Sequence, residues 1–384
     1  MITSKRVFAN FCVFYTKTLV KICAMCYNTK NLHDKFLILS RKGSGSMKNF
    51  FNKYFINPMA AMAQGLFASL LIGTIIKTLG TLTGWAILTE IGGYASAMAG
   101  PAMAVAIAYS LKCQPLVIFS MAAVGWAANA EGGAGGPLAV FVIALVASVV
   151  ANLISGKTKI DIILTPAVTV LLGGLLAKFV APPIGAFANE FGQLIMWATR
   201  QHPFVMGIIV SVIVGVLLTL PVSSAAICAS INLTGLAGGA ALAGCCAQMV
   251  GFACASFREN KVGGLVAQGL GTSMLQIGNI MKNPRIWIAP TLASAITGPI
   301  ATMVFKLEMN GPAISSGMGT CGLVGPIGVW QGWVETGYVA TWFDWFGLVM
   351  ICIVLPAVLT FAIDLLMRRL GWVKNGDQKL VIAK

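Results

Sequence analysis

Residues 308–330 read EMNGPAISSGMGTCGLVGPIGVW and lie between two long apolar segments. Eight of these residues are glycine or proline, which is too many for an uninterrupted helix. Glu308 is the one charged residue of the stretch, so the stretch is also too apolar for a solvated loop. Inside a membrane, non-helical backbone is tolerated only where it is buried in protein or lines a watery cavity. The stretch therefore predicts a broken, membrane-embedded segment on the path of a polar solute.

The composition is that of an integral membrane protein. Hydrophobic residues make up 58% of the chain, charged residues make up 10%, and the mean hydropathy is +0.86. These values exclude a soluble globular domain. We expect an all-α integral membrane protein with about 8–10 transmembrane helices and re-entrant or broken helical segments. The predicted spans are 58–80, 85–109, 115–129, 137–155, 162–180, 204–220, 236–257, 286–305 and 346–367, and the shorter stretch 187–199 predicts an interfacial amphipathic helix.

Basic residues are concentrated at the two ends of the chain. Residues 1–56 hold ten Lys and Arg against one acidic residue, and residues 368–384 hold five against one. The positive-inside rule therefore predicts that both termini are cytoplasmic. Attraction to anionic lipid explains these charges, so we expect a lipid bilayer as partner and no nucleic acid.

The same pattern divides the chain into three parts. Residues 1–46 form a basic N-terminal extension, which is either disordered or an upstream addition ahead of Met47. Residues 47–370 form the membrane-embedded transport domain, and residues 371–384 form a basic cytoplasmic tail.

The sequence carries no motif for catalysis or for a metal. Cys23-Ala-Met-Cys26 has CxxC spacing but no second pair, so the cysteines are interpreted as reduced, small apolar residues. His202 is interpreted as a loop residue at the membrane interface. Because no P-loop, Ser-His-Asp set or zinc motif is present, we expect no catalytic residue, no cofactor and no metal site.

A faint internal echo accompanies the broken stretch. Residues 220–227 read LPVSSAAI and are followed by LTGLAGG at 233–239, while residues 311–316 read GPAISS and are followed by GMGTCGLVG at 317–325. Each half has a proline, then a serine pair, then a glycine-rich run. Transporters often carry paired interrupted segments, one in each structural repeat, with the substrate between them. The echo predicts that the two breaks lie close together.

The two serine pairs, Ser223-Ser224 and Ser315-Ser316, are the first candidate substrate-binding residues. Each pair stands two to four residues after a proline, a pattern typical of a helix start where free backbone N–H groups point outward. Two such helix tips would attract a hydroxylated or anionic solute. The alternative is that these serines satisfy backbone groups inside a kinked helix.

Amide, hydroxyl and carboxylate side chains near the breaks complete the predicted site. Gln276 and Asn279 stand three residues apart on one predicted helical face, which suits either sugar hydroxyls or helix–helix hydrogen bonds. Glu308 borders the broken stretch and would contact substrate or a proton, or else pair with Lys306. The remaining candidates are Asn232, Asn310 and Thr320.

These segments resemble the membrane-embedded IIC subunit of the bacterial phosphoenolpyruvate-dependent sugar phosphotransferase system, and in particular its perfringolysin O regulator-like subgroup. The resemblance runs from about Met47 to Leu370 and rests on the motifs NPMAAMAQG (57–65), LPVSSAAI (220–227), QIGN (276–279) and NGPAISSGMGTCGLVG (310–325). It implies a homodimeric permease of the bacterial inner membrane that presents sugar to separate IIB and IIA phosphotransfer proteins. The chain departs from the family pattern in having no attached IIB or IIA domain and no Gly-Ile-Thr-Glu-Pro motif.

The sequence therefore favours a permease that binds and translocates a small polar solute, with a sugar as the expected substrate. Coupling to phosphorylation by separate IIA and IIB proteins follows from the resemblance alone. Two alternatives stay open: a phosphorylation-independent carrier of an organic acid, and a membrane sensor that binds solute without accumulating it.

Overall fold

The computed structural model describes residues 49–157 and 160–380, and throughout these ranges the regular structure is helical. An isolated antiparallel bridge between Gly235 and Met309 is the only extended pairing within them. The predicted all-α class is therefore confirmed. The predicted extension over residues 1–46 lies outside the described residues.

The first long helix alternates between α-helical and π-helical stretches. Its parts are η1 (Asn52–Ile56), α4 (Asn57–Leu66), η2 (Phe67–Leu71) and α5 (Ile72–Thr83). It ends at Gly84, whose φ of +71° is a left-handed conformation that glycine adopts without strain. The next predicted span, 85–109, is instead a pair of helices bent by 45°, α6 (Ala86–Ala97) and α7 (Ala99–Ser110).

The helices α8 (Pro115–Gly132) and α9 (Gly136–Ile154) pack against each other across the short 3-10 turn η3 (Gly133–Gly135). Each begins with a proline in its first turn, where the missing N–H removes no helical hydrogen bond. They match the predicted spans 115–129 and 137–155.

The helix α10 (Asp161–Ala198) is continuous over 38 residues. The prediction of a span ending at 180 and a separate interfacial helix over 187–199 is wrong. The rings of Pro182 and Pro183 lie on the exposed face, so they do not disturb the packed face of α10. On that packed face small residues recur every fourth position and allow close contact with α8 and α9. These residues are Thr165, Thr169, Gly173, Ala177, Ala181 and Gly185.

The second half of the chain contains five long or medium helices joined by short, broken pieces. The helices are α11 (Pro203–Thr219), α13 (Gly235–Ala255), α16 (Ile288–Pro299), α17 (Val324–Glu335) and α19 (Leu355–Arg369). The shorter pieces are α12 (Ser224–Ser230), α14 (Phe257–Val266), η4 (Ala267–Gly271), η5 (Ser273–Gln276), α15 (Ile277–Lys282), η6 (Pro284–Trp287), η7 (Ile300–Val304), η8 (Ala313–Gly317), η9 (Cys321–Leu323), α18 (Trp342–Val349) and η10 (Met350–Val354).

The helix α13 is the centre of this half, and α11, α16 and α19 pack around it. Two of its glycines permit close backbone approach. A Cβ on Gly239 would lie 1.8 Å from the carbonyl oxygen of Leu307, and one on Gly244 would lie 1.9 Å from that of Ser211. Small residues at such crossings let membrane helices approach closely, so these two positions tolerate no side chain.

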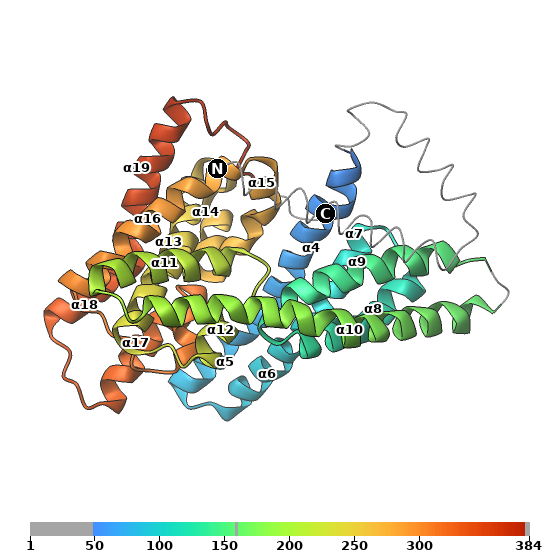
Figure 1. Ribbon diagram of the computed structural model, residues 1–384, viewed down its shortest axis with the longest axis horizontal. Helices are drawn as coiled ribbons and strands as arrows, with labels where there is room; N and C mark the ends of the chain where they lie inside the picture. Colours follow the sequence, from blue (N-terminus) through green and yellow to red (C-terminus); the bar gives the residue numbers. More distant parts are fainter. Residues whose placement is uncertain (1–48, 158–159, 381–384) are drawn as a thin grey trace.

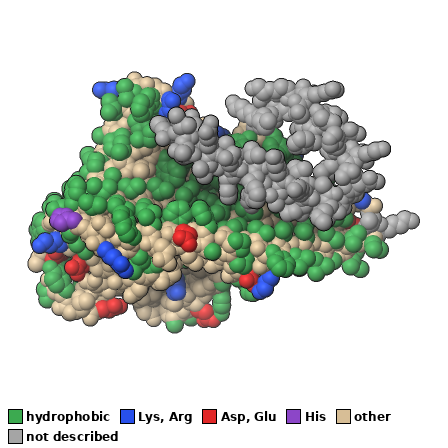
Figure 2. Space-filling view, in the orientation of Figure 1, with side chains coloured by type: hydrophobic (Ala, Val, Ile, Leu, Met, Phe, Trp, Pro, Cys, Tyr) green, Lys and Arg blue, Asp and Glu red, His purple; other side chains and the backbone are tan. Residues whose placement is uncertain are grey.

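Figure 1 shows two groups of helices, with α10 lying across both. Its contacts are with α8 and α9 in one group and with α11 and α12 in the other. Within the described ranges six helical stretches are long and apolar enough to cross a membrane, and the bent α6–α7 pair would make a seventh. Apolar side chains cover most of the visible face (Figure 2), and Ile162, Phe119 and Phe179 are more than 70% exposed. An apolar surface of this extent fits contact with lipid.

Candidate functional site

The two broken segments that echo each other in sequence lie side by side. The Ser224 hydroxyl donates to the carbonyl oxygen of Gly317 at 2.8 Å, and the Ser316 hydroxyl donates to that of Leu233 at 2.7 Å. The bridge between Gly235 and Met309 adds two backbone hydrogen bonds of 2.8 and 2.9 Å. The expectation that the two breaks lie close together is therefore confirmed.

The serines differ in how fully this packing uses them. Ser223 caps α12 by accepting a hydrogen bond from the Ala226 N–H at 3.2 Å. Ser224 and Ser316 are buried, and the hydroxyl of each donates a hydrogen bond to a backbone carbonyl of the opposite segment. Ser315 is buried as well, and its backbone N–H donates to the carbonyl oxygen of Pro312 at 2.8 Å.

The other polar residues of the broken stretch lie on both sides of this contact. Glu308 is exposed, and its carboxylate accepts a hydrogen bond from the Asn310 amide at 2.9 Å rather than pairing with Lys306. Asn232 is exposed and has a positive φ of 49°. Thr320 is buried, and its hydroxyl donates to the carbonyl oxygen of Gly269 in η4.

The predicted amides Gln276 and Asn279 hold the end of the chain. Residues 371–380, which we call the C-terminal strap, fold back over α14 and α15 (Figure 1). The Gln276 amide donates to the carbonyl oxygen of Gln378 at 2.9 Å, and the Asn279 amide donates to that of Lys379 at 2.9 Å. The Asn279 amide also donates to Gln276 Oε1 at 2.7 Å, so the two side chains act as one unit.

A buried ion cluster anchors the same strap. Arg368 Nε donates to Asp364 at 2.6 Å, a contact that their spacing of four residues along α19 allows. Sequence reasoning missed the second carboxylate, Glu259, which lies 3.1 Å from the Arg368 guanidinium. The backbone N–H of Gln378 donates to Glu259, and the Gln378 amide donates to Asp364. No local pattern could reveal Glu259, because it is more than 100 residues away along the chain.

A second group missed from sequence is centred on Gln248, which is fully buried in α13. Its Oε1 accepts hydrogen bonds from Trp287 Nε1 at 3.0 Å and from the Thr219 hydroxyl at 3.3 Å. The Thr219 hydroxyl also lies 2.8 Å from that of Ser273. The signal in the sequence was a lone glutamine inside an apolar run. Because these partners satisfy one another, we interpret the group as structural.

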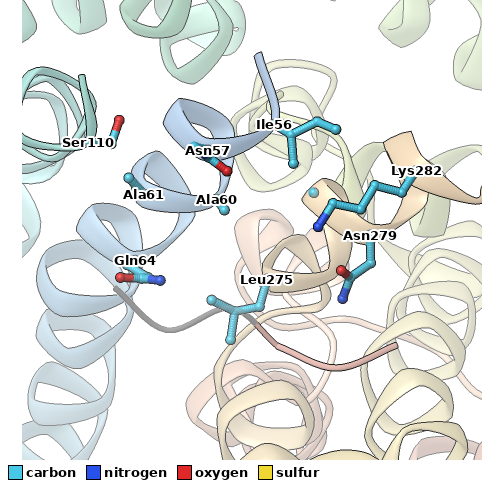
Figure 3. Close-up of a pocket in the computed structure, with 10 residues that line it drawn as sticks. Ile56, Asn57, Ala60, Ala61, Gln64, Ser110, Leu275, Asn279 and Lys282 are labelled. Carbon is cyan, nitrogen blue, oxygen red and sulfur yellow. The ribbon is translucent and has the colours of Figure 1, made fainter. Parts of the chain in front are cut away.

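A cavity of about 220 Å³ lies between α4, the end of α7 and α15 (Figure 3). Four polar side chains from two elements line it: Asn57 and Gln64 from α4, and Asn279 and Lys282 from α15. In Figure 3 the heads of Asn57 and Lys282 lie at the space between α4 and α15, whereas the Asn279 amide is turned toward Gln276 and the C-terminal strap, to which it donates. The rest of the wall is Ile56, Ala60, Ala61, Ser110, Leu275 and Gly278. The volume corresponds to about seven waters at ~30 Å³ each, and the mixture of apolar wall and few polar groups is typical of a small-molecule site.

Of the predicted site residues, Asn279 alone lines this cavity. The serine pairs and Glu308 lie at the broken segments instead. The cavity belongs to the end of the molecule that carries α14 and α15, whereas α5, α12 and α17 lie toward the opposite end (Figure 1). The predicted residues are thus divided between two places.

Comparison with known families gives this arrangement its context. A family model described as "Phosphotransferase system, EIIC" matches residues 56–380. The chain belongs to this EIIC family. No curated protein and no solved structure matches it. As an EIIC protein it is a multi-pass membrane component of a sugar-specific phosphotransferase system, which works with IIA and IIB phosphotransfer proteins. The expected family is therefore confirmed over nearly the whole membrane region.

Proposed function

We propose that this EIIC chain binds a sugar in the cavity beside Asn279 and moves it across the membrane through the paired broken segments. The presence of Asn57, Gln64, Asn279 and Lys282 in the wall of one partly open cavity carries the proposal. Amides both donate and accept hydrogen bonds, which suits the hydroxyl groups of a sugar. The apolar wall would cover the faces of the sugar ring.

The broken segments supply the second group of solute contacts in this proposal. In it the Ser315 hydroxyl would contact the solute, and the Ser316 hydroxyl would give up its hydrogen bond to the Leu233 carbonyl oxygen to bind the solute. Ser223, Ser224, Asn232, Glu308, Asn310 and Thr320 border the same contact. Gln276 orients Asn279 through their 2.7 Å hydrogen bond.

The distribution of charge supports an orientation in which the cavity opens to the cytoplasm. Lys282 and Arg285 are exposed at the cavity end, as are Arg258 and Lys261 of α14. Positive residues mark the cytoplasmic side of a membrane protein. In this orientation a IIB protein would meet sugar at the cavity, and the C-terminal strap would also be cytoplasmic.

Thermal-shift binding tests the cavity directly. The purified protein would be melted with a panel of sugars, sugar acids and carboxylates, because a bound ligand raises the melting temperature by mass action. Asn57→Ala removes a cavity amide, and Asn189→Ala is the matched control because Asn189 is an exposed amide on α10 away from the cavity. Ser315→Ala tests the broken segment separately.

We expect at least one sugar to raise the melting temperature of the unaltered protein and of Asn189→Ala. Asn57→Ala should need about fivefold more sugar for the same shift, since one hydrogen bond contributes about 1 kcal/mol. If sugar raises the melting temperature equally in all variants, the binding site does not include Asn57 or Ser315. If carboxylates bind and sugars do not, the sugar assignment fails.

Coupling to phosphorylation needs a separate measurement in cells. Uptake of the sugar found in the panel would be compared in cells with and without the general phosphotransfer proteins. We expect accumulation only when those proteins are present. Undiminished uptake in their absence would show a phosphorylation-independent carrier.

A further inference from the structure

A layer of apolar side chains lies on the cavity side of the broken stretch, which itself contributes Met318 and Cys321 to the layer. Leu71, Met249, Met318 and Cys321 form one buried cluster, and Phe67 packs against it. Each of the four buried members is at most 9% exposed. None of these side chains provides a strong hydrogen-bonding group, so a hydrated sugar cannot pass through the layer as it stands.

The first long helix fixes the order of these three regions. Gln64 lines the cavity, Phe67 follows less than one turn later, and Leu71 follows one turn after that. Ile75 comes next, and it contacts Gly322 of the broken stretch. At a rise of about 1.5 Å per residue, the distance along the helix from Gln64 to Ile75 is about 16 Å. Along this helix the apolar layer therefore follows the cavity, and it ends where the helix meets the broken stretch, which contributes Met318 and Cys321.

Two π-helical stretches meet at this level. Phe67 begins η2, and Gly271 ends η4 on the opposite side. A Cβ on Gly271 would lie 2.3 Å from the Phe67 ring, so the ring occupies the space that only a glycine leaves open. Short π-helical turns occur frequently at functional sites. Other π-helical stretches occur in this chain, so the distinguishing feature is the contact of these two between the cavity and the broken segment.

The broken segment is tied to the same level. Thr320 directly precedes Cys321, and its hydroxyl donates to the carbonyl oxygen of Gly269 within η4. A shift of the broken segment would therefore pull on η4 and on the glycine that receives the Phe67 ring. Met249 and Met318 are unbranched and flexible, which lets them repack when the ring moves.

We propose that Phe67, seated against Gly271, is the gate of the transport path, and that Leu71, Met249, Met318 and Cys321 complete its seal. The gate is closed in this structure and opens when η2 and η4 separate. Hydrophobic constrictions gate other membrane pathways by excluding water. This inference rests on the proposed function, because it takes the cavity and the broken segments as two stations of one path.

Cys321 is a built-in reporter for this gate. Its thiol is 2% exposed inside the layer, whereas Cys246 is fully buried in a different cluster, beside Cys352. Protein in liposomes would be treated with a membrane-impermeant maleimide, and labelling would be measured for each cysteine by mass spectrometry. Thiol labelling requires access of the reagent, so it follows opening of the layer.

We expect Phe67→Ala to raise labelling of Cys321 severalfold while labelling of Cys246 stays low. Phe67→Leu, which keeps a large apolar side chain, should restore most of the protection. Phe119→Ala is the matched control, since Phe119 is 71% exposed on α8 and lies outside the layer. If Phe67→Ala does not fold, Met318→Ala removes the seal from the opposite side and makes the same test.

Two results would overturn the gate. One is unchanged Cys321 labelling in both truncated variants, and the other is a parallel rise of Cys321 and Cys246, which would mean general loosening. The outcome is independent of the thermal-shift panel. Sugar binding with an unresponsive Cys321 would reject the gate and leave the proposed function standing. A responsive Cys321 without any sugar binding would reject the proposed function and, with it, the role of this layer as a transport gate.

Discussion

Replacing Arg368 with methionine would test the ion cluster that anchors the C-terminal strap. Arg368 contacts Asp364 at 2.6 Å and Glu259 at 3.1 Å, and the carboxylate side chains are 4% and 8% exposed. Removing the cation would leave two buried negative charges without compensation. Breaking a buried ion pair in this way costs about 3–5 kcal/mol, much more than the ~1 kcal/mol or less of an exposed pair.

The assay is the apparent melting temperature of the purified protein in detergent. At about 2 °C per kcal/mol, a loss of 3–5 kcal/mol lowers the melting temperature by about 6–10 °C. Arg369→Met is the control, because Arg369 is the exposed neighbour on the same turn. Its melting temperature should be close to that of the unaltered protein.

A rescue separates charge from packing. Adding Glu259→Gln and Asp364→Asn to Arg368→Met removes both uncompensated charges and should recover part of the lost stability. If the melting temperature of Arg368→Met is no lower than that of Arg369→Met, the ion cluster does not stabilise the fold and the reasoning fails. If the triple variant melts as low as Arg368→Met alone, lost packing of the long side chain accounts for the effect.

Two further substitutions have outcomes that the structure determines. Gln248→Leu removes the acceptor of the Trp287 N–H, so the apparent stability should fall by about 1–2 kcal/mol, and an unchanged melting temperature would reject a structural role for this group. Gly244→Ala places a Cβ 1.9 Å from the Ser211 carbonyl oxygen and should sharply reduce the folded fraction in size-exclusion chromatography. Gly174→Ala meets no atom within 4 Å and should behave as the unaltered protein; equal behaviour of both variants would contradict the close crossing.

The positions of the membrane spans were predictable from the sequence, because the length of an apolar run and a proline at a helix start are both local signals. Predicted spans such as 137–155 and 236–257 agree within a few residues with α9 and α13. The continuity of α10 was not predictable by the same reasoning, because a double proline ordinarily ends a helix. The decisive feature is the stripe of small residues that packs on α8 and α9. Its partner helices can be identified only from the folded structure.

The candidate site was predictable in part for the same reason. The echo of a proline, a serine pair and a glycine-rich run correctly paired α12 with η8, since both are breaks of similar composition. The spacing of Gln276 and Asn279 showed that they share a face, but did not show what that face meets. The strap returns from about 100 residues further along the chain to fill it. Asn57 opens the motif 57–65 that carries part of the family resemblance, but neither Asn57 nor Lys282 was predicted as a site residue. The cavity exists only because two distant helices leave space between them.

In the proposed function, the contact between the broken segments sets the energy that a solute must supply to separate them. Two hydroxyl bonds, from Ser224 and Ser316, and the two backbone bonds of the Gly235–Met309 bridge join the segments. At a net value of about 0.5–1.5 kcal/mol each, separating them costs about 2–6 kcal/mol. A sugar bound with millimolar to micromolar affinity supplies about 4–8 kcal/mol, and its hydroxyls can replace the same donors and acceptors. The two quantities are of similar size, so hydrogen bonds that look purely structural in the closed state are compatible with solute binding. A ligand that cannot replace these hydrogen bonds would have to offset the whole cost by itself, which favours a polyhydroxylated solute over an apolar one.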